Sequence, residues 1–363
     1  MRPLPRSLDP LPGESLPGYL LRLAHRLDLT PAELGRFLGL APASRYDCLR
    51  RQILLGISDD ALASFTCMTR LSPSEARGLT LADRRDHYPP ISQSLPKAGA
   101  PRPQIDGWLF SGFSRCCPRC LSDGDSPLWK KEWHLPVVFA CTRHERFLRY
   151  QCADCRMPPH HHVPSVLIPR AGIRGLHPAQ CRQQSSPGYG SICGARLDRQ
   201  PLRILRPSPQ LLTLQRHING LLDQHHPRKE TAEYFTDIRL MTALIIASWP
   251  SAKDRIAPRL GAAVDREVRA RRAHRARGGH YVRDTAPTDP IACGALISAA
   301  DSLLKTEDLG STLTPLFERT FESLVARESL IRVFSKHQAG CSHRTRTTTI
   351  PLIRTIRRAK RSG

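Results

Sequence analysis

Apolar residues recur at helical spacing near the start of the chain. From Leu16 to Leu27 they follow one another every three or four positions, and Ser15 stands where an N-cap is expected. The tetrapeptide Thr-Pro-Ala-Glu at 30–33 is a capping box with proline in the first turn, so a second helix should begin there and end near Gly39. Two helices joined by a tight turn have the outline of a helix-turn-helix, which many ordinary packed helix pairs share.

On this second helix, Leu34, Phe37 and Leu38 form the expected apolar face. Two further short helices are predicted after Ser58 and Ser72, which are suitable N-caps. The segment from 81 to 110 is rich in proline and polar residues, so it is expected to be a connector. The pattern predicts an N-terminal helical, helix-turn-helix-like domain over residues 1–100.

Helical patterns also fill the chain after about residue 200. The segment Thr231–Trp249 is the most apolar of them, and it is followed by a proline. Other helices are expected after Pro209, over 265–277, over 289–304 and within 312–334. These patterns predict an all-α C-terminal domain over 201–340, whose short helices beside concentrated arginine suit an array of helix-turn-helix-like units. Residues 341–363 would form a separate basic tail.

The charge of the chain narrows the choice of partner. Among 363 residues, 55 Lys and Arg face 32 Asp and Glu, which gives a formal net charge of +23. Such an excess favours a polyanion, most simply DNA or RNA, because basic side chains neutralise phosphates and release counterions. The alternative is that many arginines only solvate the surface, since lysine is rare beside arginine.

The basic residues concentrate in two places. One is the helix expected at 265–277, and the other is the acid-free segment after Ser342. The candidate nucleic-acid contacts are Arg266, Arg269, Arg271, Arg272, Arg275, Arg277, Arg357 and Arg358. Blocks of like charge tend to be flexible until a partner orders them. The segment after Ser342 is therefore expected to be either a disordered end or an arm that grips phosphates.

Neither a membrane span nor a secretory signal is expected. A span needs about 18 or more consecutive apolar residues, and the longest apolar stretches of this chain are far shorter. The first residues lack the apolar core of a signal peptide. The protein is therefore expected in the cytoplasm, where cysteines stay reduced.

Eight of the twelve cysteines fall between residues 116 and 193. In a reducing compartment such clustering favours metal binding over disulfides. Cys117 and Cys120 have the spacing of a knuckle that points two thiolates at one ion, and Cys141 with His144 repeats that spacing. Two such knuckles close a tetrahedral zinc site with three cysteines and one histidine.

A second knuckle, Cys152 with Cys155, needs two partners further along the chain. The candidates are Cys181, Cys193, His160, His161, His162 and His177. Cys181 and Cys193 are preferred, because Gly194 can adopt the left-handed turn that follows a ribbon ligand. The histidine triplet would then lie in an exposed loop.

Both zinc sites would have four protein ligands, which is the pattern of structural rather than catalytic zinc. The β-prone segments 135–140 and 147–150 would flank the knuckles. Cys116 does not fit the knuckle spacing and is a spare cysteine. Trp129 and Trp133 should lie in the core and cover the first zinc. The expected fold is mainly α with a small zinc-ribbon β region, the tandem ribbons occupying 101–200. The sequence contains no phosphate-binding loop, nucleophile elbow or comparable catalytic motif, so the protein is predicted not to be an enzyme.

The opening motif, followed by the knuckles, is similar to a known family. The motif residues are Glu14, Ser15, Tyr19, Arg22, Leu23 and Ala24. This order of motif and zinc ribbon resembles TniQ-family (TnsD-related) transposition proteins, and the resemblance covers about residues 5–200. The chain departs from the family pattern at Gly13, where the family has proline, and in the wide spacing between Cys181 and Cys193.

The resemblance implies a non-catalytic protein that selects the target site of a transposon. It would bind DNA, or a DNA- or RNA-guided complex, and recruit an AAA+ ATPase that regulates transposition. The segment around Glu14, Ser15, Tyr19 and Arg22, with the helix that ends near Gly39, would dock this ATPase. From the residues alone, the same segment is equally well a helix cap with its apolar side chains in the core. A homodimer, a stand-alone zinc-containing DNA-binding transcriptional regulator and a nuclease are left open.

Overall fold

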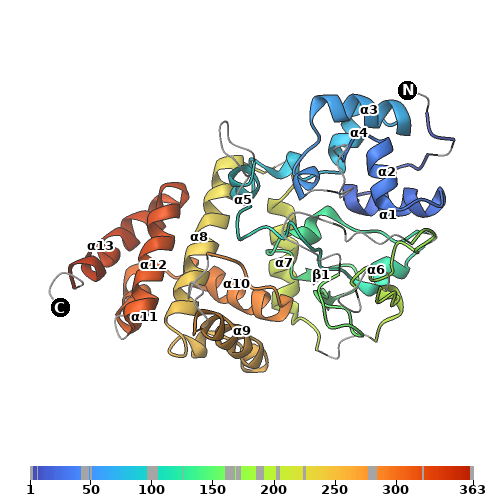
Figure 1. The fold of residues 1–363 in the computed structure, drawn as a ribbon. Coiled ribbons are helices and arrows are strands. Elements are labelled where there is room, and N and C mark those ends of the chain that lie inside the picture. The colour runs from blue at the N-terminus through green and yellow to red at the C-terminus, as the bar shows by residue number, and fades with distance from the viewer. Residues whose placement is uncertain are drawn as a thin grey trace. The chain divides into compact units, whose positions relative to one another are not determined.

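The chain forms two compact units, which are described separately (Figure 1). The computed structural model describes residues 3–5, 7–41, 49, 51–95, 105–124, 126–159, 168, 173–184, 192–201, 205–223, 226–276, 284–320 and 323–359, with the backbone alone at 275–276, 324–325 and 356–359. Unit 1 comprises residues 1–85, 93–105 and 109–207, and unit 2 comprises residues 86–92, 106–108 and 208–363. Helices make up most of the regular structure, which confirms the expectation of a mainly α fold with a small β region.

Unit 1 begins with four short α-helices. They are α1 (Leu16–Arg26), α2 (Pro31–Phe37), α3 (Asp59–Thr69) and α4 (Pro73–Gly78), with the 3-10 helices η1 (Arg51–Leu54) and η2 (Ala82–Arg84). The expected caps at Ser15, Thr30 and Ser72 are confirmed, whereas Ser58 precedes α3 but its side chain makes no capping hydrogen bond. The Ser15 hydroxyl accepts the Gly18 N–H at 3.1 Å, and Thr30 forms a capping box with Glu33. The cap residues therefore fix where α1 and α2 begin, as the local sequence predicts.

The exposed face of α2 differs from expectation at one position. Leu34 and Leu38 are buried, but the side chain of Phe37 is 52 % exposed. Phe37 follows Glu33 by four residues, so both lie on the same side of this short helix. The apolar face of α2 is thus narrower than the sequence predicts, and an aromatic ring is left on the surface.

The middle of unit 1 holds few regular elements. They are α6 (Pro118–Ser122), η3 (Lys131–His134), β1 (Ala140–Cys141), β2 (Arg146–Phe147) and η4 (Leu197–Arg199). The expected connector also contains a short helix, α5 (Pro89–Gln93), which lies largely in unit 2. The two strands form an antiparallel hairpin. The expected strands are present but only two residues long, because the chain turns at residues 136–137 before β1 begins. Leu135, Val137 and Phe139 in this segment are buried.

Unit 2 is built from helices. They are α7 (Pro209–Leu221), α8 (Arg228–Ala247), α9 (Pro258–Ala276), α10 (Pro290–Leu304), α11 (Leu309–Thr320), α12 (Leu324–His337) and α13 (His343–Ala359), with η5 (Lys253–Arg255) and η6 (Gln338–Gly340). α8 packs against α10 and α12, and all residues of α8 from 235 to 247 are buried. The most apolar predicted helix is therefore the centre of this unit.

The acid-free end of the chain is helical in its described part. α13 packs against α11 and α12, and Thr345, Thr349 and Ile353 form its buried face. These three residues recur every four positions, while Arg344 and Arg354 are exposed. The charge pattern suggested a flexible segment, but this narrow stripe of small and apolar side chains lets the helix pack against its neighbours.

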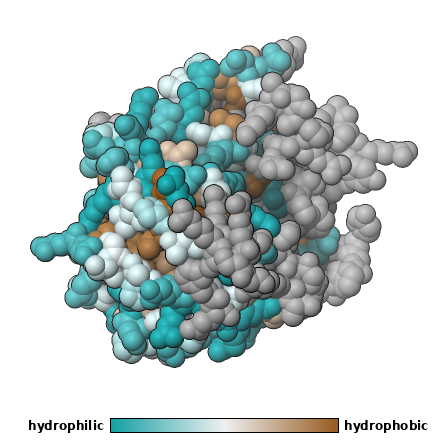
Figure 2. All heavy atoms as spheres, turned by 90° about the vertical axis from the view of Figure 1, so that its left-hand side faces the viewer, coloured by the Kyte–Doolittle hydropathy of each residue, from teal (hydrophilic) through white to brown (hydrophobic). Residues whose placement is uncertain are grey.

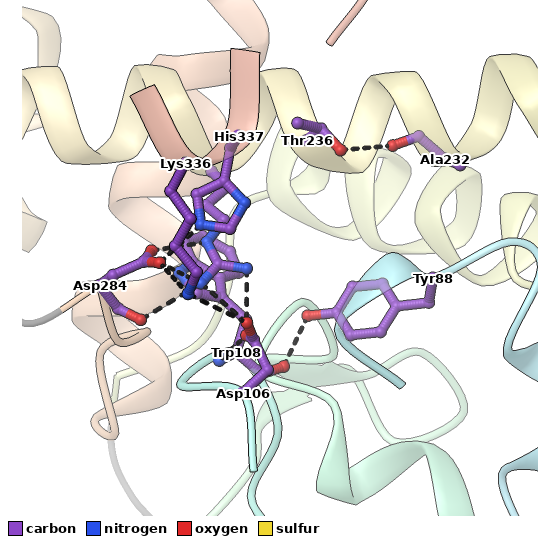
Figure 3. A network of polar contacts seen from close by, with 9 residues as sticks. Tyr88, Asp106, Trp108, Ala232, Thr236, Asp284, Lys336 and His337 are labelled. Atoms are coloured by element: carbon purple, nitrogen blue, oxygen red, sulfur yellow. Dashed lines mark hydrogen bonds and ion pairs between the residues drawn. The ribbon is translucent and has the colours of Figure 1, made fainter. Parts of the chain in front are cut away.

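A buried polar network holds the segment 106–108 in unit 2 (Figure 3). The Arg239 guanidinium of α8 lies 3.0 Å from a carboxylate oxygen of Asp106 and 2.6 Å from one of Asp284. His337 Nε2 and Lys336 Nζ, at the end of α12, lie 2.6 and 2.9 Å from Asp284 Oδ2. Burial alone would raise the pKa of Asp284, but the hydrogen bond with His337 and the charge of Arg239 hold it below its ordinary value.

The described part of the surface is mainly polar on the face that Figure 2 shows. Figure 2 shows that on the coloured part of one face the hydrophobic residues occupy small, separate areas between hydrophilic ones. Within the described ranges, no helix combines the length and the hydrophobicity that crossing a bilayer requires.

Candidate metal centres and basic surface

The first cysteine cluster is assembled by a short helix and a hairpin. Cys117 is the N-cap residue of α6, and Pro118 opens that helix, which places Cys120 one turn further on. Cys141 lies in β1, and His144 lies in the turn that leads to β2. The ligand atoms of all four residues lie within 4.8 Å of one another. The structure thus brings the first predicted ligand set together.

The separations within this cluster fit a tetrahedral metal ion. Nδ1 of His144 lies 3.5, 3.3 and 3.5 Å from the sulfur atoms of Cys117, Cys120 and Cys141, and the last two sulfurs lie 3.6 Å apart. A tetrahedron with metal–ligand bonds of about 2.0–2.3 Å has edges of about 3.3–3.8 Å. The four groups can therefore hold one ion without rearrangement.

An acidic residue, Asp123, contacts the ring nitrogen of His144 that does not face the cluster. Nε2 of His144 lies 3.1 Å from Oδ2 of Asp123, which also lies 3.1 Å from the Arg143 guanidinium. Metal-binding histidines commonly present their second ring nitrogen to a carboxylate, which fixes the tautomer and the ring orientation. Asp123 could not be recognised from the sequence, because nothing in its spacing distinguishes it from a surface residue.

The spare cysteine lies beside the cluster but does not join it. The backbone of Cys116 pairs with Arg149 through hydrogen bonds of 2.8 and 2.7 Å in both directions. Complete burial raises the pKa of the Cys116 thiol to about 12, so it stays protonated. Trp129 and Trp133 are both buried, with ring centroids 6.3 Å apart, as expected of core residues.

The second cluster consists of Cys152, Cys155, Cys181 and Cys193, whose sulfur atoms also lie within 4.8 Å of one another. The sulfurs of Cys152 and Cys193 are 3.8 Å apart, and so are those of Cys155 and Cys181. These separations equal the edge of about 3.8 Å in a tetrahedral four-sulfur site. The second set that the sequence preferred is thus also brought together.

The alternative histidine ligands are not part of this cluster in the described residues. His177 packs edge-on against the ring of His25, with centroids 5.6 Å apart, and its Nδ1 accepts the Ala179 N–H at 3.1 Å. His160, His161 and His162 lie outside the described residues. The sulfur-only set is therefore the one that the geometry supports.

Three of the eight candidate ligands are followed by a residue with left-handed backbone. Glu145 follows His144 with φ 50°, Arg156 follows Cys155 with φ 62°, and Gly194 follows Cys193 with φ 66°. This conformation turns the chain sharply away from the ligand, and glycine adopts it without a steric penalty. The prediction for Gly194 is confirmed, whereas the other two positions carry side chains that give the sequence no such signal.

Gln200 is a second residue that the sequence analysis missed. Its side chain is buried, and its Nε2 donates a hydrogen bond of 3.0 Å to the sulfur of Cys152. Burial raises the pKa of the Cys152 thiol, but hydrogen bonds from the backbone of Cys155 and Asp154 and from Gln200 bring it below its ordinary value. For Cys193, burial is the largest effect and raises the thiol pKa to about 11.

The segment before Cys181 also touches the N-terminal helices. The Trp129 indole donates to the carbonyl of Pro178 at 3.1 Å, and the Ser15 N–H donates to the carbonyl of Trp129 at 2.7 Å. Arg174 forms an ion pair with Glu33 of α2. The second cluster is therefore linked within unit 1 to the start of α1 and to α2.

The opening motif has an internal role. Glu14 and Arg22 are buried and form a two-pronged ion pair, with both distances 2.7 Å. Burial raises the pKa of Glu14, and the Arg22 guanidinium opposes that rise. Ser15 caps α1, and the buried Tyr19 donates through its hydroxyl to the carbonyl of Leu8 at 3.1 Å. These four side chains do not reach the surface, so any partner would meet the helices that they hold.

Exposed arginines line one side of α9. Arg266 and Arg269, both predicted contacts, are exposed, and so is Arg259 in the first turn of the helix. The three recur at helical spacing, and Ala262 on the same side is exposed as well. We call Arg259, Arg266 and Arg269 the α9 basic face. Arg259 was missed because the helix was expected to start at residue 265 instead of Pro258.

The remaining predicted arginines differ in their surroundings. Arg271 donates to Glu267 and to the carbonyl of Thr285, at 2.8 and 2.9 Å, so its charge is used within unit 2. Arg272 is exposed and donates to the carbonyl of Trp249 at 2.9 Å. Arg277 and the side chains of Arg275, Arg357 and Arg358 lie outside the described residues.

Residues 5–148 match the family model TniQ. This segment is a TniQ domain. Proteins of the TniQ family are associated with transposition. A search among curated proteins finds no match to this chain. The TniQ match includes the opening motif and the whole first cluster, and it ends before Cys152.

Proposed function

We propose that this TniQ-domain protein is a non-catalytic transposition factor that selects the target site. In this proposal it binds DNA or a guide complex and recruits an AAA+ ATPase that regulates transposition. The observation that carries it is the combination of a TniQ domain with the α9 basic face, which lies outside the matched segment. Basic side chains at helical spacing suit the phosphates of a nucleic-acid backbone.

We further propose that each cysteine cluster holds one zinc ion. Cysteine and histidine in tetrahedral arrangement favour Zn²⁺ over oxygen-loving cations such as Mg²⁺. With four protein ligands in each cluster, no ligand position would remain for water or substrate. The zinc would therefore support the fold of unit 1, and this supports a binding role over a catalytic one.

Salt dependence tests the contact with DNA. Replacing Arg259, Arg266 and Arg269 together by glutamine should lower the slope of log K against log salt by about two to three units, because each phosphate contact contributes about 0.9. The slope is measured by titrating labelled duplex DNA with the full chain at several salt concentrations. An unchanged slope would contradict the α9 contact.

A matched control keeps the change in total charge the same. The triple replacement of Arg26, Arg77 and Arg228 by glutamine neutralises three exposed side chains that lie outside α9. We expect this control to leave the slope unchanged. Equal flattening by both triple variants would indicate diffuse attraction and would contradict a defined site on α9.

Recruitment of the ATPase is tested separately. The exposed Phe37 on α2 is the aromatic anchor that a protein partner would bury, because exposed aromatic residues often dominate interfaces. Phe37→Ser should weaken co-purification of an AAA+ ATPase encoded beside this protein, while Met157→Ser, at a side chain that is 45 % exposed, should not. If the ATPase does not bind the unaltered chain while DNA binding persists, a stand-alone DNA-binding regulator is the better description.

A further inference from the structure

The two cysteine clusters place different electrostatic demands on their surroundings. If both hold zinc, three thiolates and a neutral imidazole leave the first site with one net negative charge, and four thiolates leave the second with two. The second site is also largely buried, since Cys152 and Cys181 are fully covered. Buried negative charge requires donors of hydrogen bonds.

Gln200 supplies such a donor at a defined sulfur atom. It follows the 3-10 helix η4 and is only 7 % exposed. Its Nε2 lies 3.0 Å from Sγ of Cys152, close enough for an N–H group to donate directly to the sulfur. The amide therefore faces a ligand atom rather than solvent.

The orientation of this amide is fixed by its other end. Oε1 of Gln200 accepts a hydrogen bond of 3.1 Å from the Arg149 guanidinium and one of 3.0 Å from the Ala153 N–H. Rotating the amide by half a turn would bring its NH₂ group against two donors and its oxygen against a thiolate. Both changes are unfavourable, so the N–H group must point at Cys152.

Arg149 connects this arrangement to the first cluster. Its backbone is paired with that of Cys116, which directly precedes the ligand Cys117, while its side chain holds Gln200. A residue whose backbone lies next to one centre thus orients a side chain that touches the other.

We propose that Gln200 is a positioning residue of the second metal centre, which donates its N–H to the Cys152 thiolate and is held in that orientation by Arg149 and the Ala153 N–H. This inference rests on the proposal that the second cluster holds a metal ion. The hydrogen bond draws electron density from one of the four sulfurs and fixes where that sulfur lies. The second centre is therefore asymmetric, with Cys152 its least electron-rich ligand.

The test uses the full chain loaded with ¹¹³Cd²⁺, because the cadmium resonance reports the electron density that its ligands donate. The unaltered chain should give two resonances, one from the four-sulfur site and one from the site with a nitrogen ligand. Gln200→Glu keeps the acceptor for Arg149 and removes the donor, so it should shift the four-sulfur resonance and leave the other in place. Gln200→Leu removes both ends of the amide and should shift the same resonance.

A neighbouring glutamine provides the control. Gln180 donates to the carbonyl of Gly194 at 3.0 Å and accepts the His177 N–H at 2.7 Å, and in these bonds it contacts backbone rather than sulfur. Gln180→Leu should therefore leave the cadmium shift unchanged. In competition with a chelator, both Gln200 variants should lower the zinc affinity of the second site by about 10- to 100-fold, as the loss of a partner of a metal ligand does elsewhere.

The possible failures are distinct. A four-sulfur resonance that stays in place in Gln200→Glu and Gln200→Leu, while both resonances persist, overturns the role of Gln200. A single resonance in the unaltered chain, from the site with a nitrogen ligand, overturns the second metal ion itself and is seen before any substitution is made.

Discussion

The two cysteine clusters offer nearly the same ligand chemistry on very different supports. The first is complete between Cys117 and His144, and a helix start and a hairpin hold its ligands. The second extends from Cys152 to Cys193, and in its described part only isolated bridges pair the backbone. The first is thus built by neighbours in the sequence, while the second depends on distant groups such as Gln200.

Only part of each metal site is encoded by neighbouring residues. A knuckle needs only its own spacing and a turn, which is why both Cys-x2-Cys pairs could be recognised. Joining two knuckles needs a framework, and the first cluster carries its own within the TniQ domain. The second cluster depends on contacts with Trp129, α1 and α2 for its framework, so we expect it to bind zinc less tightly than the first.

The largest effect is expected from breaking the first cluster. Cys120→Ser should remove its zinc and unfold the middle of unit 1, because zinc binding contributes about 10 kcal/mol or more in small zinc modules. Zinc per chain and hydrogen exchange over residues 131–149 measure this. Cys116→Ser is the control, since Cys116 is buried but is not in the cluster, and it should keep both zinc ions. Two zinc ions in Cys120→Ser would contradict the assignment.

Breaking the second cluster should have a smaller and more local effect. Cys181→Ser should reduce the zinc content from two ions to one and leave the first cluster loaded. Hydrogen exchange should become faster in residues 173–184, and also in α1 and α2, because the segment before Cys181 contacts both helices. Loss of both zinc ions in this variant would show that the first cluster is not independent.

Replacing a residue that orients a ligand should lower the zinc affinity less than replacing the ligand itself. Asp123→Asn should lower the zinc affinity of the first centre by about tenfold, because the His144 ring loses the carboxylate that orients it. Asp154→Asn, at an exposed acid between two ligands of the second cluster, should leave the zinc affinity of both centres unchanged. Competition with a chelator measures both. Equal affinities in Asp123→Asn and the unaltered chain would mean that the hairpin alone orients the ring.

The smallest effects concern the left-handed residues that follow the ligands. Glu145→Gly should raise the free energy of unfolding by about 1 kcal/mol, because glycine tolerates φ 50° without steric cost. Gly194→Ala, at φ 66°, should lower it by a similar amount. Denaturant unfolding in the presence of excess zinc provides both values. The opposite sign at either position would show that packing, rather than the turn, sets the preference.

The local features of this fold could be predicted from the sequence. Ser15 and the capping box at Thr30 and Glu33 mark where α1 and α2 begin, because a cap satisfies backbone N–H groups only a few residues away. The knuckle spacing marks the first ligand set for the same reason. The TniQ domain could also be recognised, since its opening motif and the knuckles of its first cluster are each short linear patterns.

Other features depended on contacts between distant segments. The burial of Glu14 with Arg22 and the packing of α13 follow from what surrounds them in space. The amide of Gln200 reaches Cys152 across 48 positions of sequence. A periodic pattern encodes which side of a helix is apolar, but not which neighbour covers it.

The ends of the helices, the knuckles and the TniQ match over residues 5–148 can therefore be recognised from the sequence, because each depends on interactions within a few residues or on a linear motif. The folded chain is needed to show which cysteines complete the second cluster, which groups contact Cys152 and His144, and which arginines stay on the surface. These outcomes require the chain to be folded, since burial and hydrogen bonding between segments far apart in sequence are set by packing.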